Sequence, residues 1–166
     1  MHSFLIVSRD KKKASLYISD FLKKKGIYPI DISQPVYEKA VGIEDVRNIQ
    51  KSILFKPFKG KSKAIVIEAY EGITTEAQNA LLKILEEPPI NTIIVVSIPK
   101  KELLLPTIIS RCKIIELQGN DLALSREENI QYLYLNFLRQ LQKTYTIIKS
   151  TNVNQRIALE NLFLSF

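Results

Sequence analysis

Short apolar runs, separated by segments with helical spacing, are the feature that most constrains the fold of this chain. The runs occur at residues 4–7, 64–67, 92–97 and 113–117. A strand that is apolar throughout is buried on both faces, which is typical of parallel sheets covered by helices. We therefore predict an α/β domain with a mostly parallel sheet and helices on both of its faces.

The first helix follows the first run directly. Apolar residues recur at helical spacing from Ala14 to Leu22, and three lysines come before Gly26. Cations suit the last turn of a helix and glycine suits the position after it, so Gly26 is expected to end this helix. Residues 30–32 are expected to form a second short strand.

Further helices are indicated by their end signals. Acidic residues at 44–45 predict the start of one helix. Residues 75–78 fit a capping box, Ser/Thr-x-x-Glu/Gln, and the helix that it starts should stop at the prolines 88–89. Residues 103–110 are expected to form a short helix.

The chain of 166 residues fits one ordinary domain with a small appendage. Residues 119–121, Gly-Asn-Asp, offer a plausible boundary. We therefore predict an α/β domain over 1–119 and a C-terminal helical segment over 120–166. Within that segment, residues 126–149 and 154–166 are each expected to be helical.

Composition limits the classes of protein. A single cysteine, Cys112, excludes an internal disulfide framework and a multi-cysteine zinc site, and packing is its expected role. No apolar run is long enough to span a membrane, and the N-terminus does not resemble a secretory signal. We expect a cytoplasmic protein with no membrane partner and no cofactor of its own.

The loop after the first strand lacks the features that bind phosphate. A phosphate-binding loop uses glycines, whose backbone N–H groups wrap the phosphates, together with a lysine and a Ser or Thr. Residues 8–14 here contain no glycine, and Asp10 would repel phosphate. Lys12 or Lys13 could lie near an anion, so these two lysines mark a degenerate nucleotide site.

The end of the 64–67 run lacks a second catalytic feature. A working ATPase places Asp-Glu there, one carboxylate for magnesium and one to activate water. This chain has Glu68-Ala69, so Glu68 could hold a metal but the second carboxylate is missing. Capping of the strand end is the plainer interpretation of Glu68. The segment Gly60-Lys61-Ser62 resembles the end of a phosphate-binding loop. It comes before a strand instead of after one, so it is best interpreted as a basic turn.

A net charge of +7 favours contact with phosphate backbones or acidic protein surfaces. Four lysines, Lys56, Lys59, Lys61 and Lys63, gather in one loop. They could contact DNA or an acidic partner, or they could form a solvated loop.

Two segments carry a resemblance to a known family. Residues 74–89 are Thr-Thr-Glu-Ala-Gln-Asn-Ala-Leu-Leu-Lys-Ile-Leu-Glu-Glu-Pro-Pro, and residues 105–112 are Leu-Pro-Thr-Ile-Ile-Ser-Arg-Cys. Together they resemble the clamp-loader branch of the AAA+ family, and within it the delta prime type of DNA polymerase III subunit. Residues 42–47 and 56–61 resemble that family's segments in the same order, and 151–162 are similar to the last helix of its C-terminal collar.

This resemblance implies roles for particular residues. Arg111 matches the arginine finger that such subunits present to ATP on a neighbouring subunit. Ser110, Glu86 and Glu87 would lie with it at the subunit interface. Ser97 matches the sensor region, although the Ile-Pro that follows departs from the family pattern.

The resemblance implies a non-hydrolysing subunit of a DNA polymerase III clamp loader. Its partners would be a gamma/tau-type ATPase neighbour and a delta-type subunit, with the sliding clamp and primed DNA bound through the complex. Two alternatives remain open. The chain could bind or hydrolyse ATP weakly through Lys12 or Lys13 and Glu68, or it could be a stand-alone DNA-binding protein.

Overall fold

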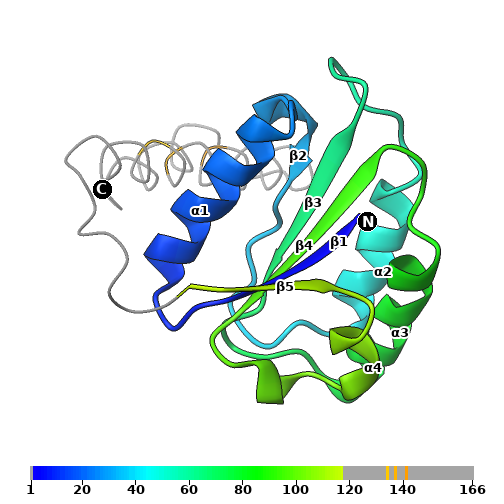
Figure 1. Cartoon of the computed structure of the whole chain (residues 1–166). Coiled ribbons are helices and arrows are strands. Elements are labelled where there is room, and N and C mark those ends of the chain that lie inside the picture. The colour runs from blue at the N-terminus through cyan, green and yellow to red at the C-terminus, as the bar shows by residue number, and fades with distance from the viewer. Residues whose placement is uncertain (1, 118–133, 135–136, 138–140, 142–166) are drawn as a thin grey trace, which may run out of the picture. The chain divides into compact units, whose positions relative to one another are not determined.

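The computed structural model describes residues 2–117 and positions 134, 137 and 141. The described residues form a five-stranded sheet in the order β2-β3-β4-β1-β5 (Figure 1). The strands are β1 (Ser3–Val7), β2 (Ile32–Ser33), β3 (Lys63–Glu68), β4 (Thr92–Ile98) and β5 (Lys113–Glu116). Every neighbouring pair of strands is parallel, which confirms the predicted α/β class.

Helices cover both faces of this sheet (Figure 1). Helix α1 (Lys11–Lys24) covers one face, and α2 (Ile43–Ser52), α3 (Thr75–Glu86) and α4 (Pro106–Ile109) cover the other. Two short 3-10 helices, Pro29–Asp31 and Lys101–Leu103, lie in the connections.

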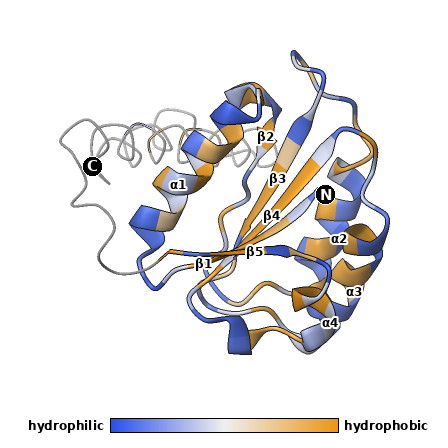
Figure 2. Ribbon diagram, in the orientation of Figure 1, coloured by the Kyte–Doolittle hydropathy of each residue, from blue (hydrophilic) through white to orange (hydrophobic). Residues whose placement is uncertain are grey.

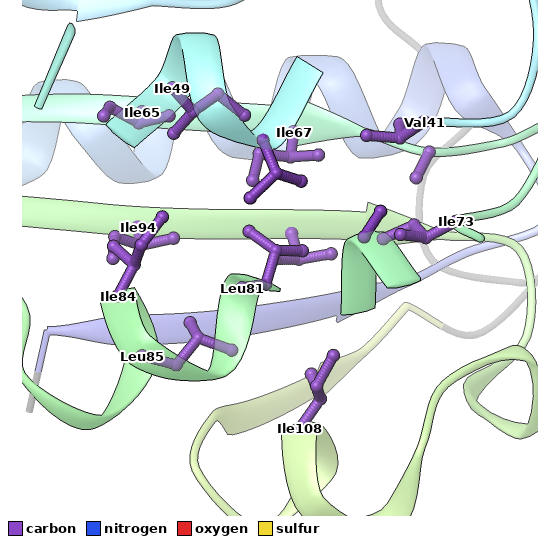
Figure 3. Packing of buried hydrophobic residues seen from close by; sticks show 14 of the residues in the cluster. Val41, Ile49, Ile65, Ile67, Ile73, Leu81, Ile84, Leu85, Ile94 and Ile108 are labelled. Atoms are coloured by element: carbon purple, nitrogen blue, oxygen red, sulfur yellow. The ribbon is translucent and has the colours of Figure 1, made fainter. Parts of the chain in front are cut away.

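The central strands supply apolar side chains to both faces, as successive residues of a strand point to opposite sides. In β3, Ile65 and Ile67 belong to the larger core cluster under α2 and α3, whereas Ala64 and Val66 belong to the cluster under α1. Figure 2 shows these strands as almost uniformly apolar, and Figure 3 shows the larger cluster, with Leu81 of α3 facing the sheet. Ala77, Leu81, Ile84 and Leu85 of α3 are buried in this cluster.

Helix α1 ends as its sequence predicts. Gly26 has a φ of 73°, and its N–H donates to the carbonyl of Lys23 (2.9 Å). The N–H of Ile27 donates to the carbonyl of Leu22 (3.1 Å). This pair of bonds is the Schellman arrangement that glycine favours after a helix.

Two predicted local features differ from the structure. A second short strand is present, but β2 is Ile32–Ser33, and Pro29–Asp31 form a 3-10 turn in which the buried carboxylate of Asp31 binds backbone N–H groups of a distant loop. The predicted capping box does not form, since the hydroxyl of Thr74 accepts the N–H of Ala77 (3.3 Å) and caps α3, while the Gln78 side chain binds elsewhere.

The helix predicted over 103–110 is interrupted. Leu105 is extended, with φ −62° and ψ 141°, and α4 begins only at Pro106. A residue before proline is disfavoured in the helical region, whereas proline itself is suited to the first helical position. The break therefore follows from Pro106.

By compactness the chain divides into two units, Met1–Ala123 and Leu124–Phe166. The predicted boundary near 119 and the helices predicted over 126–149 and 154–166 lie outside the described residues, apart from the single positions given above. Within the described part, no helix is both long and apolar enough to cross a membrane.

Lys63 does not belong with the loop lysines, contrary to the sequence prediction. It is the first residue of β3 and is 9% exposed. Its Nζ donates to the carbonyls of Ser52 (3.1 Å) and Ile53 (2.7 Å), and also to that of Phe55. These carbonyls follow the end of α2, where a helix leaves acceptors without partners, so Lys63 caps α2 from another element. Burial lowers the pKa of Lys63.

We expect Lys63→Met to lower the free energy of unfolding by about 1–3 kcal/mol, because buried carbonyl groups would lose their donor. Urea denaturation of the variant and the parent chain measures this difference. Lys61→Met, which removes an exposed lysine from the same loop, is the matched control. Equal stability of the two variants would contradict the capping role.

Candidate functional site

The start of α1 is closed to phosphate by the chain itself. Only Ser8-Arg9-Asp10 joins β1 to α1. The Oδ1 atom of Asp10 accepts the N–H of Lys13 (3.1 Å), and Asp10 is the N-cap of the helix. A helix N-terminus attracts anions through such N–H groups, and here a carboxylate of the chain occupies that position.

A cleft of about 890 Å³ opens at the carboxyl ends of β1, β4 and β5. Its walls are formed by residues 7–10 and 99–102, with Lys13, Glu116 and Leu117. This wall carries both cations and carboxylates, and Lys101 Nζ lies 3.2 Å from Glu116 Oε1. The mixed charge gives no concentrated positive field for a triphosphate.

The structure separates the three residues predicted for a degenerate nucleotide site. Lys13 lines the cleft, whereas Lys12 and Glu68 do not. Glu68 ends β3 and is paired in register with Ser97 of β4. The hydroxyl of Ser97, which is fully buried, lies 3.3 Å from the hydroxyl of Tyr70, and Lys11 Nζ lies 5.7 Å from the Tyr70 ring centroid. Among the described residues, no group of three His, Cys, Asp or Glu side chains is placed to hold a metal ion. Lys12, Lys13 and Glu68 are therefore not gathered in one cleft.

Arg111 lies at the far side of the larger core cluster, directly after α4. Ile108 and Cys112 are buried on either side of it, and the N–H of Arg111 donates to the carbonyl of Ile108 (3.0 Å). Burial raises the pKa of the Cys112 thiol to about 11, consistent with the packing role expected for it. The backbone of Arg111 is therefore anchored on both sides, while its side chain is 34% exposed.

The Arg111 guanidinium has two partners among the described residues. Its Nη2 lies 2.6 Å from Glu86 Oε1, at the end of α3, and its Nη1 donates to the carbonyl of Thr107 (2.8 Å). The hydroxyl of Ser110 donates to the same carbonyl (3.0 Å). The structure thus brings together Ser110, Arg111 and Glu86. Glu87, the C-cap residue of α3, is exposed beside them.

Gln78, whose side chain was assigned only to a capping box, fixes the start of this segment. Its buried side chain donates to the carbonyls of Ile73 (3.0 Å) and Leu103 (3.1 Å), and accepts the N–H of Leu105 (2.7 Å). One amide therefore joins α3 to the extended residues before α4. A Gln near the start of a helix gives the same sequence pattern whether its side chain caps that helix or bridges to another segment. The bridge made by Gln78 could therefore not be predicted from the sequence.

The loop of residues 54–62 forms a second surface. Asp31 accepts the backbone N–H groups of Phe58, Lys59 and Gly60, and there is little room for a side chain at position 60, where an added Cβ would lie 3.1 Å from Asp31 Oδ2. The loop exposes Leu54 (79%), Phe55 (73%) and Phe58 (82%) beside its lysines. The lysines were visible in the sequence, but the exposure of these apolar residues was not.

The fold and this site are those of a clamp-loader-type AAA+ domain in which a carboxylate, that of Asp10, caps the helix after β1. Among solved structures, a DNA polymerase III gamma subunit-related protein from Thermotoga maritima aligns over 98% of this chain and 53% of its own, with a TM-score of 0.61 and 24% identity. The clamp loader delta protein of Bacillus subtilis aligns over 70% of this chain and 38% of its own, with a TM-score of 0.51 and 12% identity. At these identities the likeness concerns the fold alone.

The family described as "DNA polymerase III, delta subunit" matches residues 3–121, and the chain belongs to this family, as a subunit of the delta prime type. A DNA polymerase III subunit delta' of Buchnera aphidicola is 36% identical over 116 residues, which is 69% of this chain and 33% of that protein. The subunit delta' of Haemophilus influenzae is 35% identical over 83 residues, 50% of this chain and 25% of that protein. The chain thus spans a quarter to a third of the length of these relatives.

We expect the isolated chain not to bind ATP with magnesium at micromolar concentration, because Asp10 occupies the helix start where a phosphate would bind. Titration calorimetry measures this binding directly. A clear micromolar affinity would show that the cleft accommodates a nucleotide despite Asp10.

The carboxyl group of Asp31 leads to a prediction about how the stability of the fold depends on pH. Burial raises the pKa of its carboxyl, but the N–H groups of Gly60, Phe58 and Lys59 outweigh this and hold the pKa below its ordinary value of 3.8. The unfolded chain therefore takes up this proton first, and the stabilisation, full above pH 3.8, is lost as the pH falls through the folded pKa.

Asp31→Asn should lower the free energy of unfolding at neutral pH and lose this part of its acid dependence, because an amide places a donor against backbone donors. Denaturation at a series of pH values tests this. Asp20→Asn, which removes an exposed carboxylate of α1, is the control. Parallel pH profiles for the parent chain and Asp31→Asn would contradict the assignment.

Proposed function

We propose that this protein is a non-hydrolysing subunit of a DNA polymerase III clamp loader. In this role it presents Arg111 to ATP bound on a neighbouring gamma/tau-type ATPase subunit and helps to load the sliding clamp on primed DNA. The observation that carries the proposal is a contrast. Asp10 closes the chain's own phosphate site, while Arg111 is held half-exposed on a rigid backbone.

The chemistry of such a finger follows from the guanidinium group. It has a fixed charge and a planar fork of donors, which suits it to the charge that develops on a phosphoryl group during transfer. Supplied from a second subunit, it makes hydrolysis depend on assembly. The chain then needs no nucleotide, magnesium or water-activating carboxylate of its own.

The partners follow from the same proposal. A gamma/tau-type ATPase would lie against the Arg111 surface, and a delta-type subunit would complete the assembly. The exposed apolar and basic side chains of the 54–62 loop are available for a partner outside that contact, and DNA or an acidic protein would each suit them. We expect the protein to act in the cytoplasm.

Arg111→Ala should reduce ATP hydrolysis at the neighbouring site by at least about 10²-fold, because the transition-state charge would lose its counter-charge. The rate of ATP hydrolysis by the whole complex should fall by the fraction that this site contributes to it. The measurement is steady-state ATP hydrolysis by a complex reconstituted from this protein and its ATPase subunit, with DNA and clamp present.

Arg111→Lys separates charge from geometry, since lysine keeps the charge but lacks the planar fork, and it should rescue little. Arg47→Ala, which breaks an exposed Arg–Glu pair in α2, is the matched control. Normal hydrolysis by a fully assembled Arg111→Ala complex would reject the finger role.

The stand-alone DNA-binding alternative is favoured by one observation, the lysines beside exposed Phe55 and Phe58. It requires tight, strongly salt-dependent binding of single-stranded DNA by the isolated chain. Weak binding that strengthens only within the assembled complex supports the clamp-loader role instead.

A further inference from the structure

Glu86 is the last residue of α3, and its carboxylate holds the guanidinium of Arg111 at 2.6 Å. It is the only acidic group with an ion-pair contact to Arg111 among the described residues. The contact joins two elements that are separate in sequence, the end of α3 and the residue that follows the turn after α4.

Stability of α3 does not account for a carboxylate at this position. The carbonyl end of a helix carries partial negative charge, so a cation is preferred in the last turn and an anion is disfavoured there. The ion pair is also half-exposed, at 34% for Arg111 and 47% for Glu86, and such pairs contribute little to folding. The placement of Glu86 therefore calls for a role other than helix stability.

The geometry shows what the contact does to the guanidinium. An arginine has five N–H donors in a rigid plane. The Glu86 carboxylate lies 2.6 Å from Nη2 as an ion pair, and the carbonyl of Thr107 accepts an N–H of Nη1, so groups from two elements restrict the orientation of the plane. These two contacts leave other N–H donors of the guanidinium for a further anion.

The backbone that carries Arg111 is restrained in the same way. The segment from Leu103 to Arg111 runs along α3, with Gln78 binding its start and Glu86 its end. Gln78 fixes the position of the segment's backbone, whereas Glu86 contacts the side chain of Arg111. Without these contacts, the long and flexible arginine side chain would sample many rotamers. Fixing one of them would then cost conformational entropy.

We propose that Glu86 is a positioning residue for Arg111, and that it holds the guanidinium in the orientation that the neighbouring subunit's phosphate requires. The inference rests on the finger role proposed above. Glu86 itself does not touch the nucleotide. It acts through Arg111, so its removal should affect turnover and leave nucleotide affinity unchanged.

The test uses the assembled complex with four forms of this subunit: parent, Glu86→Gln, Arg111→Ala and the double variant. Glu86→Gln should lower kcat at the neighbouring site by roughly tenfold, with KM for ATP unchanged, because misplacement of a catalytic group by about 1 Å has effects of that size or larger. In the double variant, loss of Glu86 should add nothing to the loss of Arg111.

A spectroscopic measurement on the free chain tests the contact independently of activity. Pairing restricts rotation about the Nε–Cζ bond, so the Arg111 Nη groups should give separate nitrogen NMR signals, identified by their loss in Arg111→Ala. In Glu86→Gln these signals should merge. Glu44→Gln, which breaks the exposed Glu44–Arg47 pair of α2, should leave them unchanged.

The outcomes separate the two proposals. If Arg111→Ala has no effect on hydrolysis, the finger role fails and the positioning role fails with it. If Arg111→Ala is impaired but Glu86→Gln has the parent kcat, the finger role stands and the positioning role is overturned. A higher kcat in Glu86→Gln would also overturn it, since Glu86 would then restrain Arg111 from the phosphate.

Discussion

The side chains of β1, β3 and β4 alternate between two apolar layers, and the rest of the structure depends on this two-sided burial. In β1, Phe4 and Ile6 lie against α1, while Leu5 lies in the larger cluster under α2 and α3. Because the strands are parallel, the chain must cross over the sheet between them, and the helices of these crossings cover both faces. The carboxyl ends of β1, β3 and β4 consequently meet at one edge, where Asp10, Glu68 and Ser97 are found.

That edge is where an ATPase of this fold would bind its nucleotide, and here its polar side chains make contacts within the chain. Asp10 supplies a carboxylate to the helix start, and Ser97 is buried against Tyr70. Helix α3 and the α4 segment pack on the same sheet through the larger core cluster. Burial of Ile108 and Cys112 in that cluster holds Arg111 at the surface, as the proposed arginine role requires.

Much of the fold could be predicted because its signals are local. Apolar runs indicated the strands, and Gly26 marked the end of α1 through its positive φ. The errors occurred where a distant partner overrides a local signal. Lys63 is buried because α2 ends nearby, and residues 29–31 turn because Asp31 binds a loop that begins more than twenty residues later.

The residues of the candidate site also divide into those that the sequence could predict and those that it could not. Arg111, Ser110 and the absence of a phosphate loop were accessible from sequence, because each lies in a contiguous motif. The contacts of Gln78 were not, because a buried amide can cap its own helix or bridge to another one, and only the neighbouring chain decides which. The exposure of Phe55 and Phe58 was equally hidden, since aromatic residues in a sequence are more often buried.

By itself, then, the sequence determined the class of fold, the family resemblance and the absence of a glycine-rich loop after the first strand, since all three depend on residue types at short spacing. Tertiary structure alone decided that Asp10 fills the vacant anion position and that Glu86 holds Arg111. Both are electrostatic contacts, whose strength depends on the distance and orientation of charged groups and on their exposure to water. Those quantities exist only once the sheet and its helices have packed.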